Sequence, residues 1–265
     1  MTIGVFDSGV GGLSVLRAIR QVLPHAPLVY VADQGYVPYG TRPPEEVRGR
    51  SEIITQFLLT QGASLIVVAC NTATAAALTY LRQAYPAVPF VGMEPAIKPA
   101  VQLTHTAVVG VLATANTFQS QRYASLLARY AQGVTLLENP CLGLVEAIER
   151  GETHTAVTRT LLREIVEPML AQKADTLILG CTHYPFVQDV LVDIVGEAVT
   201  IIDPATAVAR QVARLYPQSP HPPHHTTTTH FYTSGDPTHL QQALHNLLNW
   251  SSATVQPFPS IQTPA

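Results

Sequence analysis

The chain has 265 residues, of which 47% are hydrophobic and 12% charged, and its formal net charge is −3. This composition predicts a mostly globular protein with one large domain or two modest ones. The small negative charge gives no long-range attraction to nucleic acid or to an anionic membrane, and no apolar run approaches the roughly 20 residues that span a bilayer. The N-terminus has no signal-like segment, so we expect a cytoplasmic protein without membrane or nucleic-acid partners.

The first hundred residues alternate between strand-like and helix-like segments. Short apolar runs predict strands, and apolar residues at every third or fourth position predict helices. The expected strands are 3–6, 28–32, 65–69 and 90–93, and the expected helices are 13–23, 44–61 and 72–84. Such alternation is typical of an α/β fold, in which helices flank parallel strands.

The alternation starts again near residue 107. The expected strands are 107–112, 134–137, 176–179, 199–202 and 231–233, and the expected helices are 118–129, 143–148, 154–172, 185–195 and 237–248. A segment rich in proline, threonine and histidine, 217–230, interrupts the pattern, and we interpret it as a surface loop and not as a metal site. We expect the tail from Ser251 to be frayed.

The restart reflects an internal repeat. Two strand-like runs end on cysteines, Cys70 and Cys181, at an offset of 111 residues, and an independent alignment at an offset of 106 pairs Ser8 with Thr114. Similar offsets predict two duplicated α/β lobes, each with a parallel sheet. In such folds the carboxyl ends of the strands hold ligands, so both thiols are candidates for chemistry.

The cysteine count excludes other common uses of thiols. Three cysteines without a C-x-x-C pair form neither a disulfide framework nor a structural zinc site. We interpret Cys141 as structural. Cys70 and Cys181 each stand at an expected strand-to-helix turn, and a helix N-terminus lowers the pKa of a thiol from its usual value of about 8.5. His183, two residues after Cys181, is a candidate proton carrier or a structural histidine.

The turn after the first strand reads Asp7-Ser8-Gly9-Val10-Gly11-Gly12. Its glycine spacing differs from the dinucleotide and P-loop motifs, and an acidic side chain there would repel phosphate. Acidic, hydroxyl and backbone N–H groups together suit a small zwitterion better.

Several chemistries lack the residues they need. Pyridoxal phosphate requires a Schiff-base lysine, but the two lysines, Lys98 and Lys173, lie away from these motifs. No metal-ligand cluster is evident. A hydrolase that used Cys181 and His183 would leave Cys70 without a role. Cofactor-free proton transfer uses both thiols.

Six motifs in this order resemble those of the glutamate racemases of the aspartate/glutamate racemase superfamily: IGVFDSGVGGLSVL, ADQGYVPYGTR, VVACNTATA, VGMEPA, LILGCTHYP and YTSGDP. The resemblance extends from Ile3 to Pro237. It implies cofactor-independent interconversion of L- and D-glutamate, which supplies D-glutamate for peptidoglycan. It also implies two lobes, residues 1–95 with 208–265 and residues 96–207, with the active site between them, and allows for a homodimer.

The resemblance implies roles for individual residues. Cys70 would take the proton from D-glutamate and Cys181 from L-glutamate, with Asp7 supporting the first thiol and His183 with Glu146 supporting the second. The implied substrate contacts, to which the repeat adds Thr114, are Asp7, Ser8, Tyr39, Gly40, Asn71, Thr72, Thr114, Thr182 and His183.

Three alternatives remain open from the sequence. One is a related cofactor-free racemase that acts on aspartate or hydantoin. Another is a single-thiol hydrolase or decarboxylase on the same scaffold, in which Cys70 would be dispensable. The third is a protein that binds glutamate without exchanging its α-proton.

Overall fold

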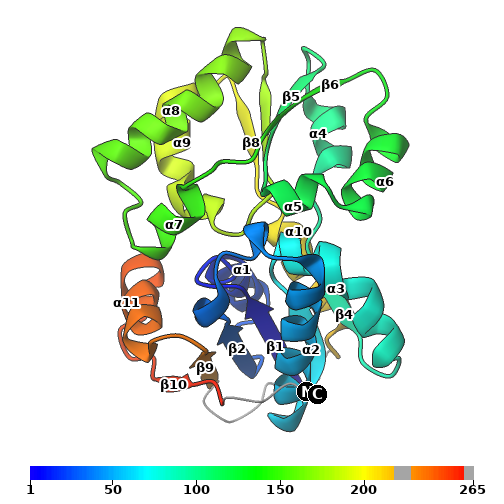
Figure 1. Cartoon of the computed structure of the whole chain (residues 1–265), viewed down its shortest axis with the longest axis vertical. Helices are drawn as coiled ribbons and strands as arrows, with labels where there is room; N and C mark the ends of the chain where they lie inside the picture. Colours follow the sequence, from blue (N-terminus) through cyan, green and yellow to red (C-terminus); the bar gives the residue numbers. More distant parts are fainter. Residues whose placement is uncertain (218–227, 260–265) are drawn as a thin grey trace. The chain divides into compact units, whose positions relative to one another are not determined.

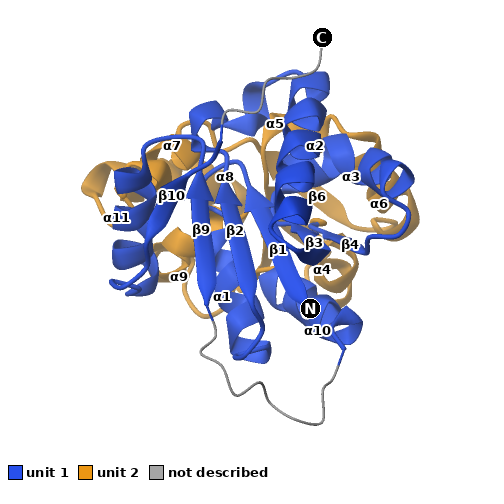
Figure 2. Ribbon diagram, turned by 90° about the horizontal axis from the view of Figure 1, so that it is seen from below, with its two compact units in different colours: residues 1–93, 205–265 blue, residues 94–204 orange. Residues whose placement is uncertain are grey.

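The computed structural model describes residues 1–217 and 228–259, and it divides the chain into two compact units. Unit 1 consists of residues 1–93 and 205–265, and unit 2 of residues 94–204 (Figures 1 and 2). Most of the segment that we interpreted as a surface loop, residues 218–227, lies outside the described residues.

Unit 1 is built on a six-stranded parallel sheet in the order β10-β9-β2-β1-β3-β4. Its strands are β1 (Thr2–Asp7), β2 (Leu28–Ala32), β3 (Ala63–Val68), β4 (Phe90–Gly92), β9 (Thr229–Thr233) and β10 (Val255–Pro257). Its α-helices are α1 (Leu13–Val22), α2 (Pro44–Thr60), α3 (Asn71–Ala84), α10 (Ala205–Leu215) and α11 (Pro237–Leu248), and two short 3-10 helices are η1 (Gln34–Tyr36) and η2 (Tyr39–Thr41).

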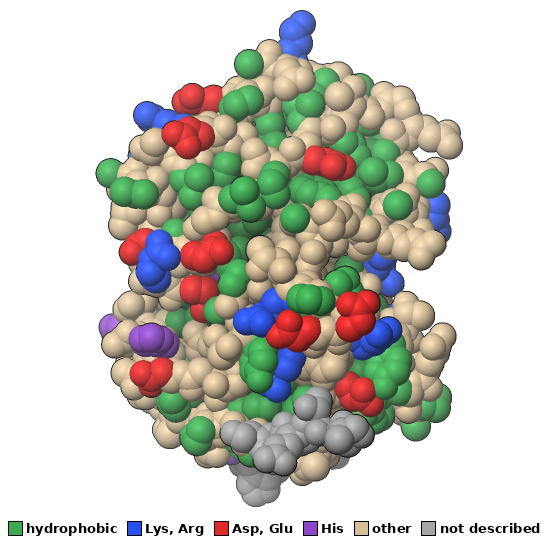
Figure 3. Space-filling view, viewed as in Figure 1, with side chains coloured by type: hydrophobic (Ala, Val, Ile, Leu, Met, Phe, Trp, Pro, Cys, Tyr) green, Lys and Arg blue, Asp and Glu red, His purple; other side chains and the backbone are tan. Residues whose placement is uncertain are grey.

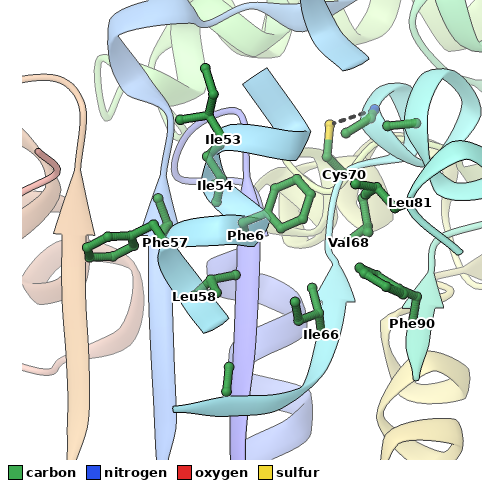
Figure 4. Close-up of a cluster of buried hydrophobic side chains, with 14 of the residues drawn as sticks. Phe6, Ile53, Ile54, Phe57, Leu58, Ile66, Val68, Cys70, Leu81 and Phe90 are labelled. Carbon is green, nitrogen blue, oxygen red and sulfur yellow. Dashed lines mark hydrogen bonds between the residues drawn. The ribbon is translucent and has the colours of Figure 1, made fainter. Parts of the chain in front are cut away.

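Burial on both faces of the sheet explains why its central strands are continuous apolar runs. On one face, Phe6 of β1 and Ile66 and Val68 of β3 pack against side chains of α2 and α3 (Figure 4). Cys70 belongs to this same buried cluster, which fixes the first thiol at the carboxyl edge of the sheet. Removing a large side chain from such a core costs about 2–5 kcal/mol.

Unit 2 has its own parallel sheet, in the order β6-β5-β7-β8. Its strands are β5 (Val108–Leu112), β6 (Thr135–Asn139), β7 (Thr176–Leu179) and β8 (Thr200–Ile202). Its helices are α4 (Ile97–Leu103), α5 (Ala115–Phe118), α6 (Gln121–Tyr130), α7 (Leu144–Glu149), α8 (Ala156–Ala171), α9 (Gln188–Val195) and the 3-10 helix η3 (Tyr184–Val187).

The expected α/β class with parallel sheets and flanking helices is confirmed, but several short elements were not predicted. Helices α4, α5 and α10 and the 3-10 helices η1 and η2 are additional, and β10 lies in the tail that we expected to be frayed. That expectation is wrong for 255–258, because β10 pairs with β9 and the N–H of Phe258 donates to the carbonyl of Thr233 over 2.6 Å. The ring of Phe258 then packs edge-on against Phe57, with 4.9 Å between ring centroids.

Charged side chains of both signs are interspersed on the face drawn in Figure 3. Several form ion pairs, such as Arg42 with Glu46 at 2.6 Å and Arg159 with Asp193 at 2.9 Å. Among the described residues, no helix combines the length and apolar character needed to cross a membrane.

Candidate active site

Asp7 ends the central strand of unit 1 and is completely buried. Its carboxylate accepts hydrogen bonds from the N–H of Gly9 at 2.8 Å and the hydroxyl of Ser8 at 3.3 Å. The hydroxyl of Tyr30 donates to the carbonyl of Gly9 over 2.7 Å and holds the turn in place. A side chain at Gly12 would bring its Cβ to 2.6 Å from the Cβ of Asp7, so this turn requires glycine.

Cys70 begins α3 as its N-cap residue, as the sequence predicted. Its sulfur accepts from the N–H of Ala73 at 3.5 Å, and its thiol lies 3.9 Å from the hydroxyl of Ser8. Cys70, Ser8 and Asp7 thus form a chain of polar groups from thiol to hydroxyl to carboxylate. The positive end of the α3 dipole favours a thiolate at this position.

Asn71 and Thr72 form the first turn of α3 and are both buried. The amide nitrogen and oxygen of Asn71 have no hydrogen-bond partner among the described residues. Native proteins rarely leave buried amides unpaired, so such a group is suited to bind a polar ligand.

Tyr39 and Gly40 lie in η2 and are buried. The phenol of Tyr39 donates to Asp33 over 2.5 Å, and Asp33 also accepts two bonds from Arg50, at 2.7 and 3.0 Å. Burial, followed by the charge and hydrogen bond of Asp33, raises the pKa of Tyr39 well above its ordinary value. The phenol is therefore neutral and already hydrogen-bonded to Asp33.

The second thiol has a different local structure from the one expected. Cys181 follows β7 directly after Gly180, but the next helix is the short 3-10 helix η3, and α9 begins only at Gln188. Because Cys181 does not cap an α-helix, the helix-dipole argument applies to Cys70 and not to Cys181. The observed neighbour of Cys181 is His183, whose Nδ1 lies 3.7 Å from the sulfur.

His183 connects the second thiol to a carboxylate. Its Nε2 lies 2.6 Å from an oxygen of Glu149, and its side chain is only 2% exposed. Burial lowers the pKa of His183, but the hydrogen bonds with Cys181 and Glu149 outweigh burial and hold this pKa well above 6.5. His183 is therefore an imidazolium at neutral pH and can donate from both nitrogens.

The carboxylate beside His183 is Glu149 and not Glu146, which we had assigned to this place. Both belong to α7, but Glu146 is exposed, whereas the side chain of Glu149 is only 12% exposed and faces His183. The three-residue difference moves the carboxylate nearly one helical turn along α7. Glu146 was assigned from the resemblance to the family, and the apolar pattern of α7, which brings Glu149 nearer the buried face, was not used.

Thr114 and Thr182 lie at the carboxyl edge of the unit 2 sheet. Thr114 follows β5 and caps α5, where its oxygen accepts from the N–H of Thr117 at 3.3 Å. Thr182 is buried between Cys181 and His183. Cys141, just beyond β6, is buried at the same edge, and its N–H donates to the side chain of Asn139 over 2.8 Å.

Each unit therefore carries a thiol, hydroxyl groups and a carboxylate-terminated polar chain at the carboxyl edge of its sheet. The order is Asp7–Ser8–Cys70 in unit 1 and Glu149–His183–Cys181 in unit 2. None of the three cysteines forms a disulfide. In the part of the chain that the structure describes, no group of three or more histidine, cysteine or acidic side chains could hold a metal ion.

Comparison with known proteins shows the family of this chain. The family model for Asp/Glu/Hydantoin racemase matches residues 6–212. The chain belongs to this racemase family. A glutamate racemase of Ectopseudomonas mendocina is 53% identical over 250 residues, which cover 93% of this chain and 94% of the relative. One of Stutzerimonas stutzeri is 50% identical and covers 97% of each.

Solved structures of family members share the fold. Glutamate racemase isoform RacE1 of Bacillus anthracis superimposes with a TM-score of 0.85 at 30% identity, covering 98% of this chain and 97% of that one. Escherichia coli glutamate racemase, in complex with L-glutamate and the activator UDP-MurNAc-ala, gives a TM-score of 0.83 at 32% identity and covers 97% of each chain.

Proposed function

We propose that this member of the racemase family interconverts L- and D-glutamate by proton transfer between two thiols, without a cofactor. The observation that carries the proposal is the pair of buried thiols, Cys70 and Cys181, each at the carboxyl edge of a sheet and each joined to a carboxylate by one intervening side chain. The glutamate racemases that cover more than nine-tenths of the chain at about half identity support glutamate as the substrate.

The reaction proceeds in two balanced steps. One thiolate takes the α-proton, so that a C–H bond breaks and an S–H bond forms. The other thiol then donates its proton to the opposite face of the planar carbanion. Cys70 acts as the base on D-glutamate and Cys181 on L-glutamate, and the mechanism requires both sulfurs to reach the same α-carbon. Each turnover reverses which thiol is protonated, and proton exchange of the thiols with solvent restores the starting form.

The polar residues of the two units divide the recognition of glutamate. Asn71, Thr72 and Thr182 donate to the α-carboxylate, where negative charge develops as the proton leaves. The unpartnered amide of Asn71 supports this role. Asp7 and Ser8 accept from the ammonium group.

The remaining contacts hold the substrate's far end and the second thiol. The backbone of Tyr39 and Gly40 binds the distal carboxylate, and Thr114 contacts the substrate as the counterpart of Ser8. His183 and Glu149 support Cys181, and Asp7 supports Cys70.

The proposal also concerns the biological setting. Two catalytic thiols must remain reduced, which favours the cytoplasm. The product, D-glutamate, would serve peptidoglycan synthesis. Self-association as a homodimer stays a prediction, to be checked by size-exclusion chromatography with light scattering.

Incubation with either glutamate isomer in D₂O tests the proposed function. We expect optical rotation to decay to zero from both sides while deuterium enters the α-position of the isomer formed. Exchange without inversion would indicate a single-thiol reaction, and binding without exchange would indicate a glutamate-binding protein. Either result would refute the proposal.

A further inference from the structure

Tyr184 is a large side chain in unit 2 that the proposed mechanism does not use. It begins η3 and is completely buried. Its hydroxyl has no hydrogen-bond partner among the described residues. A buried hydroxyl without a partner destabilises a folded protein, so its presence calls for a functional reason.

Two thiols lie around this hydroxyl. Tyr184 follows Cys181 by three residues, and its N–H donates to the carbonyl of Cys181 over 3.2 Å, which closes the turn between them. Besides burial, the sulfurs of Cys141 and Cys181 both raise the pKa of this hydroxyl, and Cys141 has the larger effect of the two. Cys141 is held at a positive φ of 48°, and its thiol donates to the carbonyl of Asn139 over 3.4 Å.

The protonation states of these groups decide which one can accept a strong hydrogen bond. Burial raises the pKa of Tyr184 well above 10 and also raises the pKa of Cys141, so both keep their protons at neutral pH. The groups that face Cys181 are thus a neutral phenol, the neutral thiol of Cys141 and the imidazolium of His183, with Glu149 behind it. Cys181 is the one that ionises in the proposed reaction.

We propose that Tyr184 is a positioning residue whose hydroxyl donates a hydrogen bond to the sulfur of Cys181 when that thiol is ionised. The hydroxyl makes no hydrogen bond of good geometry in the described part of the chain and gains a charged acceptor once the sulfur of Cys181 ionises, so it favours the thiolate. The hydroxyl also gives the sulfur of Cys181 a second hydrogen-bond donor besides Nδ1 of His183. Two donors together fix the direction of the sulfur lone pair that accepts the α-proton. The inference rests on the proposed function only in taking Cys181 as the base.

Thiol alkylation in Tyr184→Phe tests the inference without any substrate. Initial rates of reaction with iodoacetamide at pH 7 and pH 10 are followed separately for Cys181 and Cys70 by peptide mass spectrometry. We expect the rate at Cys181 to fall roughly 10-fold at pH 7 and to recover at pH 10, where the thiolate forms without help. The rate at Cys70 should stay unchanged. An unchanged rate at Cys181 at pH 7 would overturn the inference.

Two further variants separate the hydroxyl from packing. Tyr123→Phe removes another buried hydroxyl of unit 2, which is bonded to Glu138 at 2.7 Å, and should leave the alkylation of Cys181 unchanged. Cys141→Ala removes packing around Tyr184 but keeps its hydroxyl, and should also leave the rate at Cys181 unchanged. A fall in either variant as large as in Tyr184→Phe would assign the effect to packing and refute the inference.

Thermal melting and turnover complete the test. Because Phe removes an unpaired hydroxyl, the melting temperature of Tyr184→Phe should equal or exceed that of the unsubstituted protein, while kcat from L-glutamate falls roughly 10-fold. A lower melting temperature would show that the hydroxyl has a structural partner and would count against the inference. If the unsubstituted protein does not racemise glutamate, the proposed function fails, while the alkylation rates still decide the role of Tyr184.

Discussion

Glu149 and His183 are joined by a 2.6 Å contact between Oε1 and Nε2, and the other nitrogen of the same ring lies 3.7 Å from the sulfur of Cys181. The carboxylate therefore acts on the thiol through a single imidazole. This arrangement orients the ring, keeps it protonated and places a positive charge beside the sulfur, where it favours the thiolate.

Replacing Glu149 tests whether its carboxylate acts on Cys181 through His183. Glu149→Gln should lower kcat from L-glutamate by roughly 10- to 100-fold, because the imidazolium loses its hydrogen-bonded counter-charge. The loss from D-glutamate should be smaller, since Cys70 is then the base. Glu146→Gln is the matched control on the same helix and should stay within about twofold of the unsubstituted protein. Initial rates measured from L- and D-glutamate test this prediction. Equal losses in the two variants would contradict the proposed action of Glu149 on Cys181 through His183.

The same contact predicts how stability depends on pH. The pKa of His183 is raised on folding, so its contribution to stability is fully present below the unfolded value of about 6.5 and is lost as the pH rises through the folded value. Glu149→Gln should therefore destabilise the protein most below about pH 6.5 and least in alkaline solution, above the folded pKa of His183. Urea unfolding of both proteins, measured from mildly acidic to alkaline pH, gives the change in the free energy of unfolding. A destabilisation that grows with pH would refute the assignment.

The hydrogen bonds of Asp175 predict that unit 2 loses folding stability at low pH. Burial raises the pKa of this carboxyl, but hydrogen bonds from Thr104, His105, Thr106 and Thr176 outweigh burial and lower the pKa to about 2. Because the folded pKa is depressed from 3.8, the stabilisation is present above pH 3.8 and is lost as the pH falls through 2.

Asp175→Asn should cost on the order of 1 kcal/mol at pH 7 after solvent screening, and the cost should vanish near pH 2. Asp193→Asn, which removes an exposed ion pair with Arg159, is the control and should change stability by less than about 0.5 kcal/mol. Equal effects of the two substitutions at pH 7 would show that the hydrogen bonds to Asp175 do not stabilise the fold.

Tyr39 anchors the loop that we propose for the distal carboxylate. Tyr39→Phe removes the 2.5 Å hydrogen bond to Asp33 and should raise KM for glutamate about 5- to 10-fold with a smaller change in kcat. Tyr80→Phe removes a comparable bond, from Tyr80 of α3 to Glu52 of α2, and should leave KM unchanged. Steady-state kinetics with both isomers separates the two variants. A change in kcat alone would place Tyr39 elsewhere in the reaction.

The same loop should discriminate chain length. Aspartate is one methylene shorter than glutamate, so contact with the loop would displace its α-carbon from the thiols. A displacement near 1 Å can cost on the order of 100-fold in rate. We expect racemisation of aspartate to be slower by at least this factor at equal concentration. Comparable rates would assign the chain to a different substrate within its family.

Strands and thiols could be predicted from the sequence because both depend on local patterns. An apolar run ending on Cys70 or Cys181 is visible without coordinates, and the parallel sheets follow from the alternation with helices. Helix α10 had a readable signal, since Val208 and Val212 lie four residues apart and are buried. Strand β10 had none, because only its pairing with β9 makes it a strand.

Long-range polar contacts could not be predicted in the same way. Asp33 pairs with Arg50, seventeen residues away, and Glu149 with His183, thirty-four residues away. Along α7 the signal was readable, because at about 100° per residue Glu149 lies at the margin of the apolar face formed by Leu144, Val145 and Ile148, and Glu146 lies nearly opposite that face. The burial of the Tyr184 hydroxyl without a hydrogen-bond partner among the residues that the structure describes depends on packing, so the sequence motif around Tyr184 does not predict it.

The most direct test of the two-thiol mechanism measures the half-reactions of Cys70→Ser and Cys181→Ser with the L and D enantiomers of one diastereomer of β-chloroglutamate. Removal of the α-proton by one thiolate expels chloride from the β-carbon, so elimination needs one base, whereas racemisation needs both. We predict that both variants lose racemisation, that Cys70→Ser still eliminates chloride from the L isomer, and that Cys181→Ser still eliminates it from the D isomer. A variant that racemises glutamate, or that eliminates chloride from both isomers at the unsubstituted rate, would contradict the mechanism.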